Sequence, residues 1–539
     1  MTSKQPNLMP EDIQRMIGKD AQRNNIFAAK MVSEIIKTTL GPKGMDKMLV
    51  SPTNEITITN DGATILNKMQ IEHPAAKMMV EVAKTQESEV GDGTTTAVML
   101  AGKLLENSEK LLDQKIHPTL ITKGYQLAAK KCQQILKEIS LKIEPEDHEI
   151  LKQIAMTAMT GKGAESSKEK LSEILVKAIL QIKNENNFDL ENIKIEKLRG
   201  EEIENTELIS GIVLDKEKTS QDMPSKISNP KIALVDFPLE LKNPEIQTKI
   251  SISSPEQLQN FLSQEEETIK KIVFHIKQTG ANVIFCQKGV DDYAQYLFSK
   301  ENIYVCRRVA QSDMRKIAKA INGKIVSNLN ELTLNELGNA EIVEEKKHGD
   351  EFLTYIRGCS NPKALTILIK GGTDHIIDEI ERALMDGLGD LLSTLKTKLV
   401  VPGGGAIEME LSKRLRDYGH TLSGREQLAI NEFASALEFI PLTLSENAGL
   451  DPIDVLTELR SLHDSGQKNA GLNLFTNKIE NVLHAKIIEP VKIKSQAISS
   501  ASEVATLILR IDDVIASAKN TKGNMDSTGG LPKGMRTDF

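Results

Sequence analysis

The sequence predicts a multidomain protein in which mainly helical ends enclose an α/β middle. Its 539 residues exceed what one core usually holds, since single hydrophobic cores stop growing at roughly 250–300 residues. Apolar residues recur at helical spacing over 11–40 and again after 402, whereas short β-branched runs alternate with helical stretches between 193 and 365. Aromatic residues make up only 3% and Trp is absent, so the cores must be built from aliphatic side chains, which favours helix packing.

The composition argues against several classes of partner. The net charge of -8 and the pI of about 5.8 give no reason to expect binding to nucleic acid or to an anionic membrane. The amino-terminal residues form no apolar leader, and no apolar run approaches the ~18 residues that span a bilayer, so a cytoplasmic protein is expected. The four cysteines form no C-x-x-C pair, which predicts free buried thiols rather than a zinc site or disulfides. They are Cys132, Cys286, Cys306 and Cys359.

Helices dominate the first 140 residues. A helical pattern over 11–40 ends at a Gly-Pro pair, because both residues stop helices. The β-branched alternation at 55–59 predicts a strand, and the Asn-Asp-Gly run around Asp61 predicts a hairpin turn or an exposed carboxylate. Further helices are expected over 93–112 and 120–139.

The chain changes character near 142–147. A helical region over 149–182 gives way to strand-like runs, and the alternation of strands and helices up to about 365 is typical of a separate α/β domain. After 402 the pattern is strongly helical to about 518, and the polar, Gly-rich tail at 519–539 is expected to be disordered. Both ends are therefore expected to build one discontinuous domain that carries two inserted ones. The expected strands are 193–198, 208–214, 232–235, 281–286 and 303–306, with a helix over 293–299 between the last two.

The strongest local signal for chemistry is the run GDGTTT at 91–96, directly before an apolar helix. A helix N-terminus has unpaired N–H groups and a partial positive charge, so it binds phosphate. The glycines let an anion approach the backbone, and the threonine hydroxyls add donors. Asp92 is placed to hold Mg²⁺, a hard cation that prefers oxygen ligands. Ordinary helix capping by Asp and Thr is the alternative.

Other ATP-binding signals are weaker or missing. The loop LGPKG at 40–44 fits a phosphate loop but also an ordinary turn. The sequence has no GxxxxGK[ST] and no set of protein-kinase motifs, so neither a P-loop ATPase nor a kinase of that type is indicated.

Three segments, in order, resemble the signature sequences of group II chaperonins, the archaeal thermosome class. They read TTLGPKGMDKML at 38–49, ITNDGATI at 58–65 and QESEVGDGTTT at 86–96. Eukaryotic cytosolic chaperonin subunits are also similar, and the resemblance covers nearly the whole chain. It continues at 161–165, 211–215, 286–289, 401–406, 448–452 and 508–513.

The resemblance implies the chaperonin fold. This fold has a mainly α equatorial ATPase domain, an α/β intermediate domain, and an α/β apical substrate-binding domain with a helical protrusion. It also implies a double ring of identical or paralogous subunits, closed by a built-in lid without a separate co-chaperonin. The implied bounds are 1–145 and 402–518 for the equatorial domain, 146–214 and 369–401 for the intermediate domain, 215–368 for the apical domain with the lid protrusion at about 245–277, and 519–539 for a flexible tail.

Family roles carry over to the matching positions. Asp92 corresponds to the Mg²⁺ ligand, and Lys162 to the lysine that senses the γ-phosphate. Asp61 and Asp386 correspond to the two carboxylates that position and deprotonate the attacking water. The implied cofactors are ATP and Mg²⁺. The implied nucleotide-binding residues are Leu40, Gly41, Pro42, Gly93, Thr94, Thr95, Thr96, Lys162, Gly404, Glu489 and Lys494.

Asp386 ties the implied site to domain movement. It lies on an expected intermediate-domain helix, so it and Asp61 would meet only when the domains close, which couples hydrolysis to motion. Without the family, Asp386 reads as a solvated helix carboxylate. Gly387 and Gly389 depart from the family, which usually has Ala after this aspartate. Because each glycine costs a helix interior about 0.5–1 kcal/mol relative to Ala, a looser helix with slower closure or hydrolysis is predicted.

A helix start at 254–257 opens the expected lid protrusion, with Ser as cap, Pro at the first position and Gln following. From Ile269 onward its apolar stripe is expected to pack inward. The earlier apolar residues are expected to touch clients or neighbouring lids, because exposed apolar surface binds unfolded chains. A wholly buried stripe is the alternative. The predicted client or lid residues are Ile250, Ile252, Leu258, Phe261 and Leu262.

The sequence thus favours an ATP-dependent chaperone that encapsulates unfolded or partly folded proteins. A ring-forming holdase or scaffold with weak ATPase, a soluble metabolic ATP enzyme and a eukaryotic-type hetero-oligomeric subunit are the alternatives. The aspartates Asp61, Asp92 and Asp386 argue against the holdase. A particle near a megadalton would exclude the metabolic enzyme, and loss of ATPase in Asp386→Ala would exclude the holdase.

Overall fold

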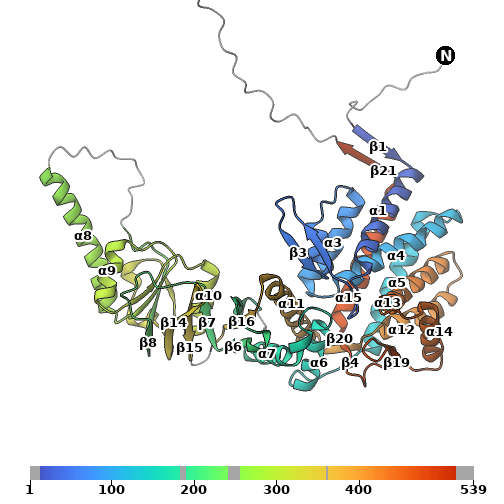
Figure 1. The fold of residues 1–539 in the computed structure, drawn as a ribbon. Helices are drawn as coiled ribbons and strands as arrows, with labels where there is room; N and C mark the ends of the chain where they lie inside the picture. The colour runs from blue at the N-terminus through green and yellow to red at the C-terminus, as the bar shows by residue number, and fades with distance from the viewer. Residues whose placement is uncertain (1–12, 183–189, 241–254, 360–361, 518–539) are drawn as a thin grey trace, which may run out of the picture.

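The computed structural model describes residues 13–182, 190–240, 255–359 and 362–517. They form three bodies in a row: a large helical body, a small middle body and an α/β body (Figure 1). The two ends of the described chain lie side by side on the helical body, as expected for a domain built from both ends of the sequence (Figure 1). In the described part of the chain, no helix is long and apolar enough to cross a membrane.

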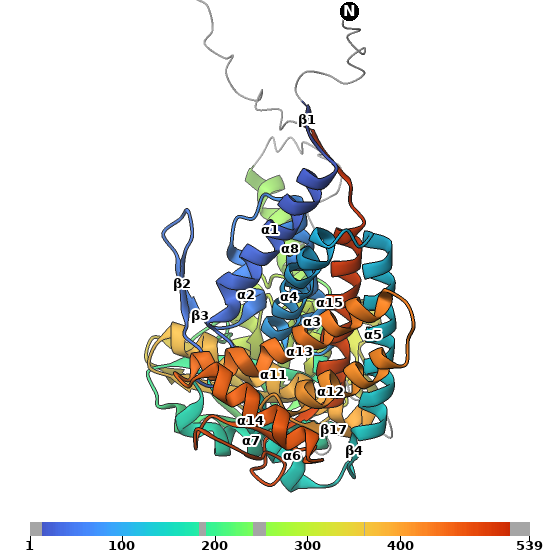
Figure 2. The ribbon, with the colours of Figure 1, turned by 90° about the vertical axis from the view of Figure 1, so that its right-hand side faces the viewer.

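The helical body has one core to which both ends of the chain contribute, and its long helices lie alongside one another (Figure 2). Aliphatic side chains such as Leu100, Ile430 and Ala501 fill it, as the scarcity of aromatic residues predicts. The rings of Tyr125 and Phe433 meet edge to face with centroids 5.7 Å apart. The helices are α1 (Lys19–Lys37), α2 (Gly62–Lys68), α3 (Pro74–Glu89), α4 (Thr94–Asp113), α5 (Pro118–Ile139), α12 (Ala406–His420), α13 (Glu426–Asn447), α14 (Pro452–Asp464) and α15 (Val491–Leu509).

The helix predicted over 11–40 was wrong at its beginning. Strand β1 (Ile13–Ile17) pairs antiparallel with β21 (Asp513–Ser517), and α1 begins only at Lys19. Gly18 separates them with φ of 67°, a left-handed conformation that suits glycine and stops a helix from extending backward. The partner strand lies at the other end of the sequence, so local periodicity could not reveal the pairing.

The region after 402 was predicted to be strongly helical, and four of its described elements are helices, but it also contains strands that were not predicted. Short strands interrupt the helices there and form small sheets. The hairpin of β18 (Ala470–Asn473) and β19 (Lys478–Asn481) is one such sheet. In another, β17 (Leu399–Pro402) lies between β20 (Ile488–Pro490) and β4 (Leu141–Lys142). Near the other end of the chain, β2 (Lys47–Val50) and β3 (Ile56–Thr59) form a hairpin. Strand β3 confirms the strand predicted at 55–59.

The middle body packs three helices against a three-stranded sheet ordered β5-β16-β6. The helical region predicted over 149–182 is two helices, because a loop around Gly161 and Gly163, both with positive φ, breaks it. The strand predicted at 208–214 is likewise two strands, which belong to different sheets. The elements are α6 (His148–Met159), α7 (Lys168–Gln181), α11 (Asp374–Thr397), β5 (Ile193–Arg199), β6 (Glu207–Ile209) and β16 (Leu365–Gly371).

The α/β body contains two sheets. Parallel strands in the order β11-β10-β9-β12 carry β13 on β9, and an antiparallel sheet has the order β7-β15-β14-β8. The strands are β7 (Gly211–Leu214), β8 (Lys226–Ser228), β9 (Lys231–Val235), β10 (Val283–Cys286), β11 (Tyr304–Cys306), β12 (Ile325–Val326), β13 (Gly338–Asn339), β14 (Ile342–His348) and β15 (Glu351–Arg357). The helices are α8 (Pro255–Gln278), α9 (Asp292–Lys300) and α10 (Gln311–Ile321). All four cysteines are buried free thiols, as predicted.

Helix α8 projects from the α/β body, and the figure shows its first turns away from the sheets (Figure 1). It begins at Pro255, where the sequence predicts it. Ile269, Val273 and Ile276 are buried and Ile272 is partly buried, which confirms the inward packing expected of this stretch. Ile250 and Ile252 lie outside the described residues. The side chains of Leu258, Phe261 and Leu262 also lie outside the described part, so the predicted client contacts remain predictions.

Candidate functional site

The N-terminus of α4 points its free N–H groups into a cavity. Gly93 is the N-cap in a left-handed conformation, with φ of 81°, and no side chain caps the helix. The alternative of ordinary capping by Asp or Thr is therefore wrong. The preceding loop is fixed by buried Gln86, whose Nε2 donates to the carbonyl oxygens of Asp92 at 2.8 Å and of Ile493 at 3.3 Å. A helix end of this kind attracts anions.

Asp61 is a helix cap rather than a hairpin turn. It precedes α2, and its carboxylate accepts hydrogen bonds from the backbone N–H of Thr64 at 2.7 Å and of Ala63 at 3.4 Å. The hydroxyl of Thr94, in the first turn of α4, donates to the same carboxylate at 3.1 Å. Both predictions for the Asn-Asp-Gly run, a hairpin turn and an exposed carboxylate, were wrong, because α2 begins at the glycine. The result places Asp61 beside the α4 N-terminus.

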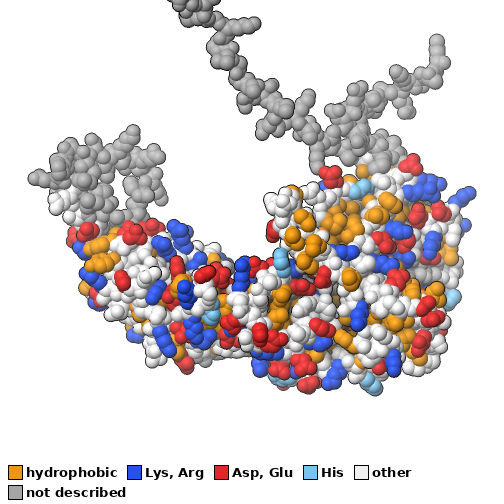
Figure 3. Space-filling view, in the orientation of Figure 1, with side chains coloured by type: hydrophobic (Ala, Val, Ile, Leu, Met, Phe, Trp, Pro, Cys, Tyr) orange, Lys and Arg blue, Asp and Glu red, His pale blue; other side chains and the backbone are white. Residues whose placement is uncertain are grey.

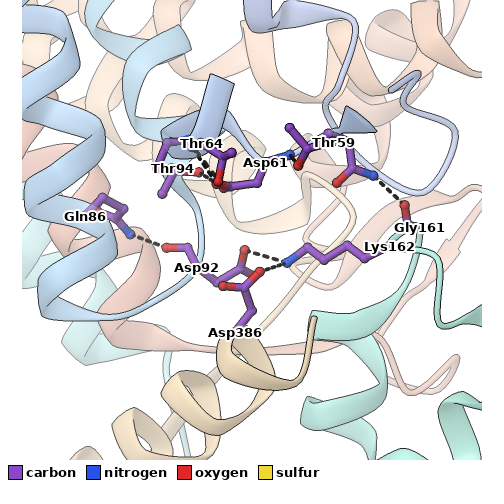
Figure 4. A network of polar contacts seen from close by, with 11 residues as sticks. Thr59, Asp61, Thr64, Gln86, Asp92, Thr94, Gly161, Lys162 and Asp386 are labelled. Atoms are coloured by element: carbon purple, nitrogen blue, oxygen red, sulfur yellow. Dashed lines mark hydrogen bonds and ion pairs between the residues drawn. The ribbon is translucent and has the colours of Figure 1, made fainter. Parts of the chain in front are cut away.

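Lys162 joins three segments that are far apart in sequence (Figure 4). Its Nζ lies 3.1 Å from Oδ1 of Asp92 and 2.6 Å from Oδ2 of Asp386. Asp92 precedes α4 in the helical body, Lys162 lies in the loop between α6 and α7, and Asp386 lies on α11. The side chain of Asn60 donates to the carbonyl of Gly161 at 2.7 Å and holds that loop against the helical body.

Burial shapes the ionisation of this cluster. It raises the pKa of Asp386 from 3.8 to about 7, even though the Lys162 ammonium opposes the shift. Burial alone would lower the pKa of Lys162, but the charges of Asp386 and Asp92 outweigh it and raise that pKa. The alternative interpretation of Asp386, a solvated carboxylate on a helix, is therefore wrong. The cluster holds more negative charge than its one lysine can balance.

Asp390 belongs to the same cluster, and sequence reasoning missed it. It lies one helical turn after Asp386 on α11 and is 2% exposed. Its Oδ1 is buried and makes no hydrogen bond to any described residue. Burial, with the charges of Asp92 and Asp386, raises the pKa of Asp390 well above its ordinary value. The spacing of four residues from Asp386 was the available signal, because it puts both carboxylates on one helix face.

The two glycines after Asp386 have a packing reason. Helix α11 runs without a break from Asp374 to Thr397. A Cβ at Gly389 would lie 2.4 Å from the carbonyl oxygen of Val90, and one at Gly387 would lie 2.6 Å from Cδ1 of Leu175. The glycines therefore let α11 approach the loop before Asp92 and the helix α7. The predicted effect on hydrolysis rate remains a prediction.

A cavity of about 550 Å³ unites most of the predicted residues. Its volume lies within the range of small-molecule sites. Asp386 does not line the cavity, but it forms an ion pair with Lys162, which does. At its edge the Nζ of Lys168, on α7, lies 4.7 Å from the ring centroid of Phe475, in the β18–β19 turn. The predicted residues that line it are Leu40, Gly41, Pro42, Asp61, Asp92, Gly93, Thr94, Thr95, Thr96, Lys162, Gly404, Glu489 and Lys494.

Comparisons with known proteins identify the family. Residues 32–519 match the TCP-1/cpn60 chaperonin family. The chain belongs to this family. It is 51% identical over 519 residues to a thermosome subunit of Methanopyrus kandleri, covering 96% of this chain and 95% of that protein. It is 52% identical over 532 residues to the thermosome subunit beta of Archaeoglobus fulgidus, covering 98% and 97%. A thermosome subunit of Pyrococcus horikoshii is 51% identical over 527 residues, covering 97% and 96%.

The resemblance to group II chaperonins, and with it the chaperonin fold, is confirmed. The protein is an ATP-dependent chaperonin subunit, and the metabolic ATP enzyme is excluded as an alternative. The chaperonin's cavity is also lined by Lys494 and Glu489, which belong to a second ion-pair group. Nζ of Lys494 lies 2.6 Å from Oε2 of Glu489 and 2.9 Å from Oε1 of Glu408. Burial raises the pKa of Glu489, with Lys494 opposing the shift. Glu408 is a further residue that the motifs did not indicate.

Proposed function

We propose that this chaperonin subunit hydrolyses ATP with Mg²⁺ in the cavity at the α4 N-terminus and uses hydrolysis to close around client proteins. The observation that carries the proposal is the position of Lys162. It makes ion pairs with Asp92 and Asp386 beside the N-terminus of α4, whose first N–H groups have no side-chain cap. Phosphoryl transfer needs this combination of anion donors, a cation and water-positioning carboxylates.

Each proposed role follows from a contact. The first N–H groups of α4 and the hydroxyls of Thr95 and Thr96 would bind phosphate oxygens. Lys162 would contact the terminal phosphate, and so would exchange its carboxylate partners for a phosphate. Asp61, fixed by Thr94 and the α2 N-terminus, is rigid enough to orient a water molecule. Asp386 has a raised pKa, which suits a group that accepts a proton from that water.

The donor set fits Mg²⁺ bound together with phosphates. Asp92 supplies a carboxylate, and Mg²⁺ is usually held by one or two carboxylates plus substrate phosphates rather than by an all-protein cage. In the described part of the chain, no three His, Cys, Asp or Glu side chains form a ready metal site. The phosphates would therefore have to complete the coordination. When bound, Mg²⁺ would neutralise charge that develops on the phosphates.

The contacts between bodies explain how hydrolysis could drive movement. Asp61 and Asp92 belong to the helical body, whereas Lys162 and Asp386 belong to the middle body. Helix α11 also touches the helical body through Arg382, whose Nη2 donates to the carbonyl of Ile58 at 3.3 Å. A rotation of the middle body would separate the two halves of the site. Nucleotide binding and hydrolysis would in turn favour one domain arrangement.

We further propose that the three bodies are the equatorial, intermediate and apical domains at the bounds given above, with α8 as the core of the lid. Unfolded or partly folded proteins would be its clients, and the cytoplasm its location. The subunit would assemble with identical or paralogous copies into a double ring. Relatives named thermosome subunit alpha and thermosome subunit beta support paralogous subunits.

Exposed apolar side chains support the proposed assembly. Met48 is 65% and Val50 63% exposed on β2, and Ile56 is 44% exposed on β3. Figure 3 shows apolar side chains gathered on the helical body where Figure 1 places β3 and α3. Clustered apolar surface of this kind marks protein interfaces.

Size-exclusion chromatography and ATP turnover test the proposal together. We expect a particle near a megadalton in which Asp386→Ala hydrolyses ATP about 100–10,000-fold more slowly, the range for losing a positioned acid–base group. Nucleotide binding, followed by equilibrium dialysis, should persist in this variant. A large particle with unchanged turnover in Asp386→Ala would indicate the holdase or scaffold instead. A particle no larger than a dimer would contradict the ring.

A further inference from the structure

We propose that Asp390 is a second protein ligand, beside Asp92, for the divalent cation that enters with the nucleotide. The inference rests on the proposed function, and it concerns a residue to which the matched motifs assign no role. Asp390 is 2% exposed, lines the nucleotide cavity and has a buried Oδ1 without a hydrogen-bond partner in the described chain.

A buried carboxylate without a partner is costly. Burying an unpaired charge costs several kcal/mol, and even a neutral polar group loses about 1–3 kcal/mol when its hydrogen bond is missing. Folded proteins therefore pair nearly all such atoms. The exceptions call for a partner that binds later, and Asp390 lines a cavity that can admit one.

The neighbours of Asp390 indicate that this partner is a cation. Asp92, Asp386 and Glu489 all act on it as negative charges, and Lys162 acts as the positive one. Lys162 already forms ion pairs with two carboxylates. A nucleotide would add more negative charge to this end of the cavity. A divalent cation is the partner that offsets both the phosphates and an additional carboxylate.

The fold brings Asp390 to the metal side of the cavity. On α11 it follows Gly389, whose Cα is close enough to the loop that an added Cβ would lie 3.3 Å from Cα of Gly91. Gly91 immediately precedes Asp92. Because Gly389 has no side chain, the helix turn that carries Asp390 can lie against the loop that carries Asp92. Two carboxylates with substrate phosphates are an ordinary ligand set for Mg²⁺.

Mn²⁺ binding to the assembled full chain tests the inference. Free Mn²⁺ is counted by its electron paramagnetic resonance signal during titration in the presence of a non-hydrolysable ATP analogue. We expect Asp390→Asn to weaken Mn²⁺ binding about tenfold or more, the lower end of what loss of a metal-site partner costs. Analogue binding in EDTA should be unchanged or tighter, because a negative charge has been removed. Asp390→Leu, which leaves no unpaired amide, should weaken Mn²⁺ binding at least as much.

Controls separate this inference from the proposed function. Ser393→Ala alters a buried side chain three residues further along α11 and should leave Mn²⁺ binding unchanged. Asp92→Asn should weaken it strongly. If Asp92→Asn weakens binding while both Asp390 variants match the wild type, Asp390 is not a ligand and the proposed function stands. If Asp92→Asn binds Mn²⁺ like the wild type, the proposed metal site itself is wrong.

Discussion

Two buried clusters of carboxylates and cations in this molecule differ in how completely their charges are balanced. At the nucleotide cavity, Asp386 shares Lys162 with Asp92, and Oδ1 of Asp390 has no partner among the described residues. Between α12, α13 and α14, by contrast, the carboxylate of Glu438 accepts from Ser412 at 2.9 Å, lies 2.9 Å from Arg416 and contacts Arg460.

The pKa values of the carboxyl groups reflect this difference in charge balance. Burial raises the pKa of Asp386, because its partners do not compensate for lost solvation. Burial acts on Glu438 too, but Arg460, Arg416 and Ser412 outweigh it and lower the pKa. Nearby Glu410 follows the same pattern with His463 and Arg414. A structural cluster satisfies its own charges, whereas a binding site leaves charge for its ligand to satisfy.

The largest expected effect is on the pH dependence of stability through Asp386. A folded pKa of about 7 against an ordinary 3.8 means that its contribution to stability is full below pH 3.8 and lost as the pH rises through 7. At about 1.4 kcal/mol per pKa unit, this change amounts to about 4 kcal/mol. Asp386→Asn should therefore be more stable than the wild type near pH 8, with the difference vanishing toward pH 4. Denaturant unfolding of the nucleotide-free protein at fixed subunit concentration measures this. A difference that is independent of pH would contradict the proposed charge imbalance.

Glu438 should behave in the opposite way. Glu438→Gln removes the acceptor of two arginines, which we expect to cost about 2–3 kcal/mol of unfolding free energy at pH 7. Because the folded pKa is lowered, that stabilisation is present above the ordinary value of 4.5 and is lost as the pH falls through the folded pKa. The gap between variant and wild type should close on acidification. ATP turnover per assembled subunit should stay within twofold. A large fall in turnover in particles of normal size would mean that this cluster also serves the nucleotide site.

The contrast between the clusters also marks what the sequence could predict. The run at 91–96 led to residues that line the cavity, because short motifs carry local chemistry such as glycine turns and helix starts. Only the resemblance to the family indicated Lys162 and Asp386. The family supplied the long-range part. Nothing in the local pattern around Asp386 indicates that Lys162 approaches it, since 224 residues separate them.

The errors have different origins. Strand β1 was predicted as helix because its partner β21 lies at the opposite end of the chain, and the β18–β19 hairpin was missed within a helical pattern. Asp61 was interpreted as a turn because Asn-Asp-Gly is a strong turn signal, although the same residues also cap α2. Asp390 was missed because its burial depends on the packing of α11 against the loop at Val90.

Gly389 provides a test of intermediate size at the contact between α11 and that loop. In Gly389→Ala the new Cβ would meet the Val90 carbonyl at 2.4 Å, and backbone on both sides must move. We expect a loss of about 1–3 kcal/mol in unfolding free energy and slower ATP turnover. In the matched variant Gly387→Ala, the Cβ would meet only the flexible end of Leu175 at 2.6 Å. Its cost should be smaller, because alanine also favours the helix by about 0.5–1 kcal/mol. If the two variants have equal effects on unfolding and on turnover, then the low helix propensity of glycine, and not the close approach of α11 to the loop, determines the behaviour of this part of α11.

The smallest expected effect lies at the rim of the balanced cluster. Arg414 holds buried Glu410 at 2.7 Å through Nε and reaches Glu138 at 3.4 Å through Nη1, but the Glu138 side chain is 60% exposed. Solvent screens such a pair, so Glu138→Gln should change the unfolding free energy by at most about 0.5 kcal/mol, and less at high salt. Arg414→Gln should cost several times more, because it also leaves Glu410 with His463 alone. If thermal or denaturant unfolding finds the two variants equal, then burial does not decide which charges matter, and the distinction between the two clusters loses its physical basis.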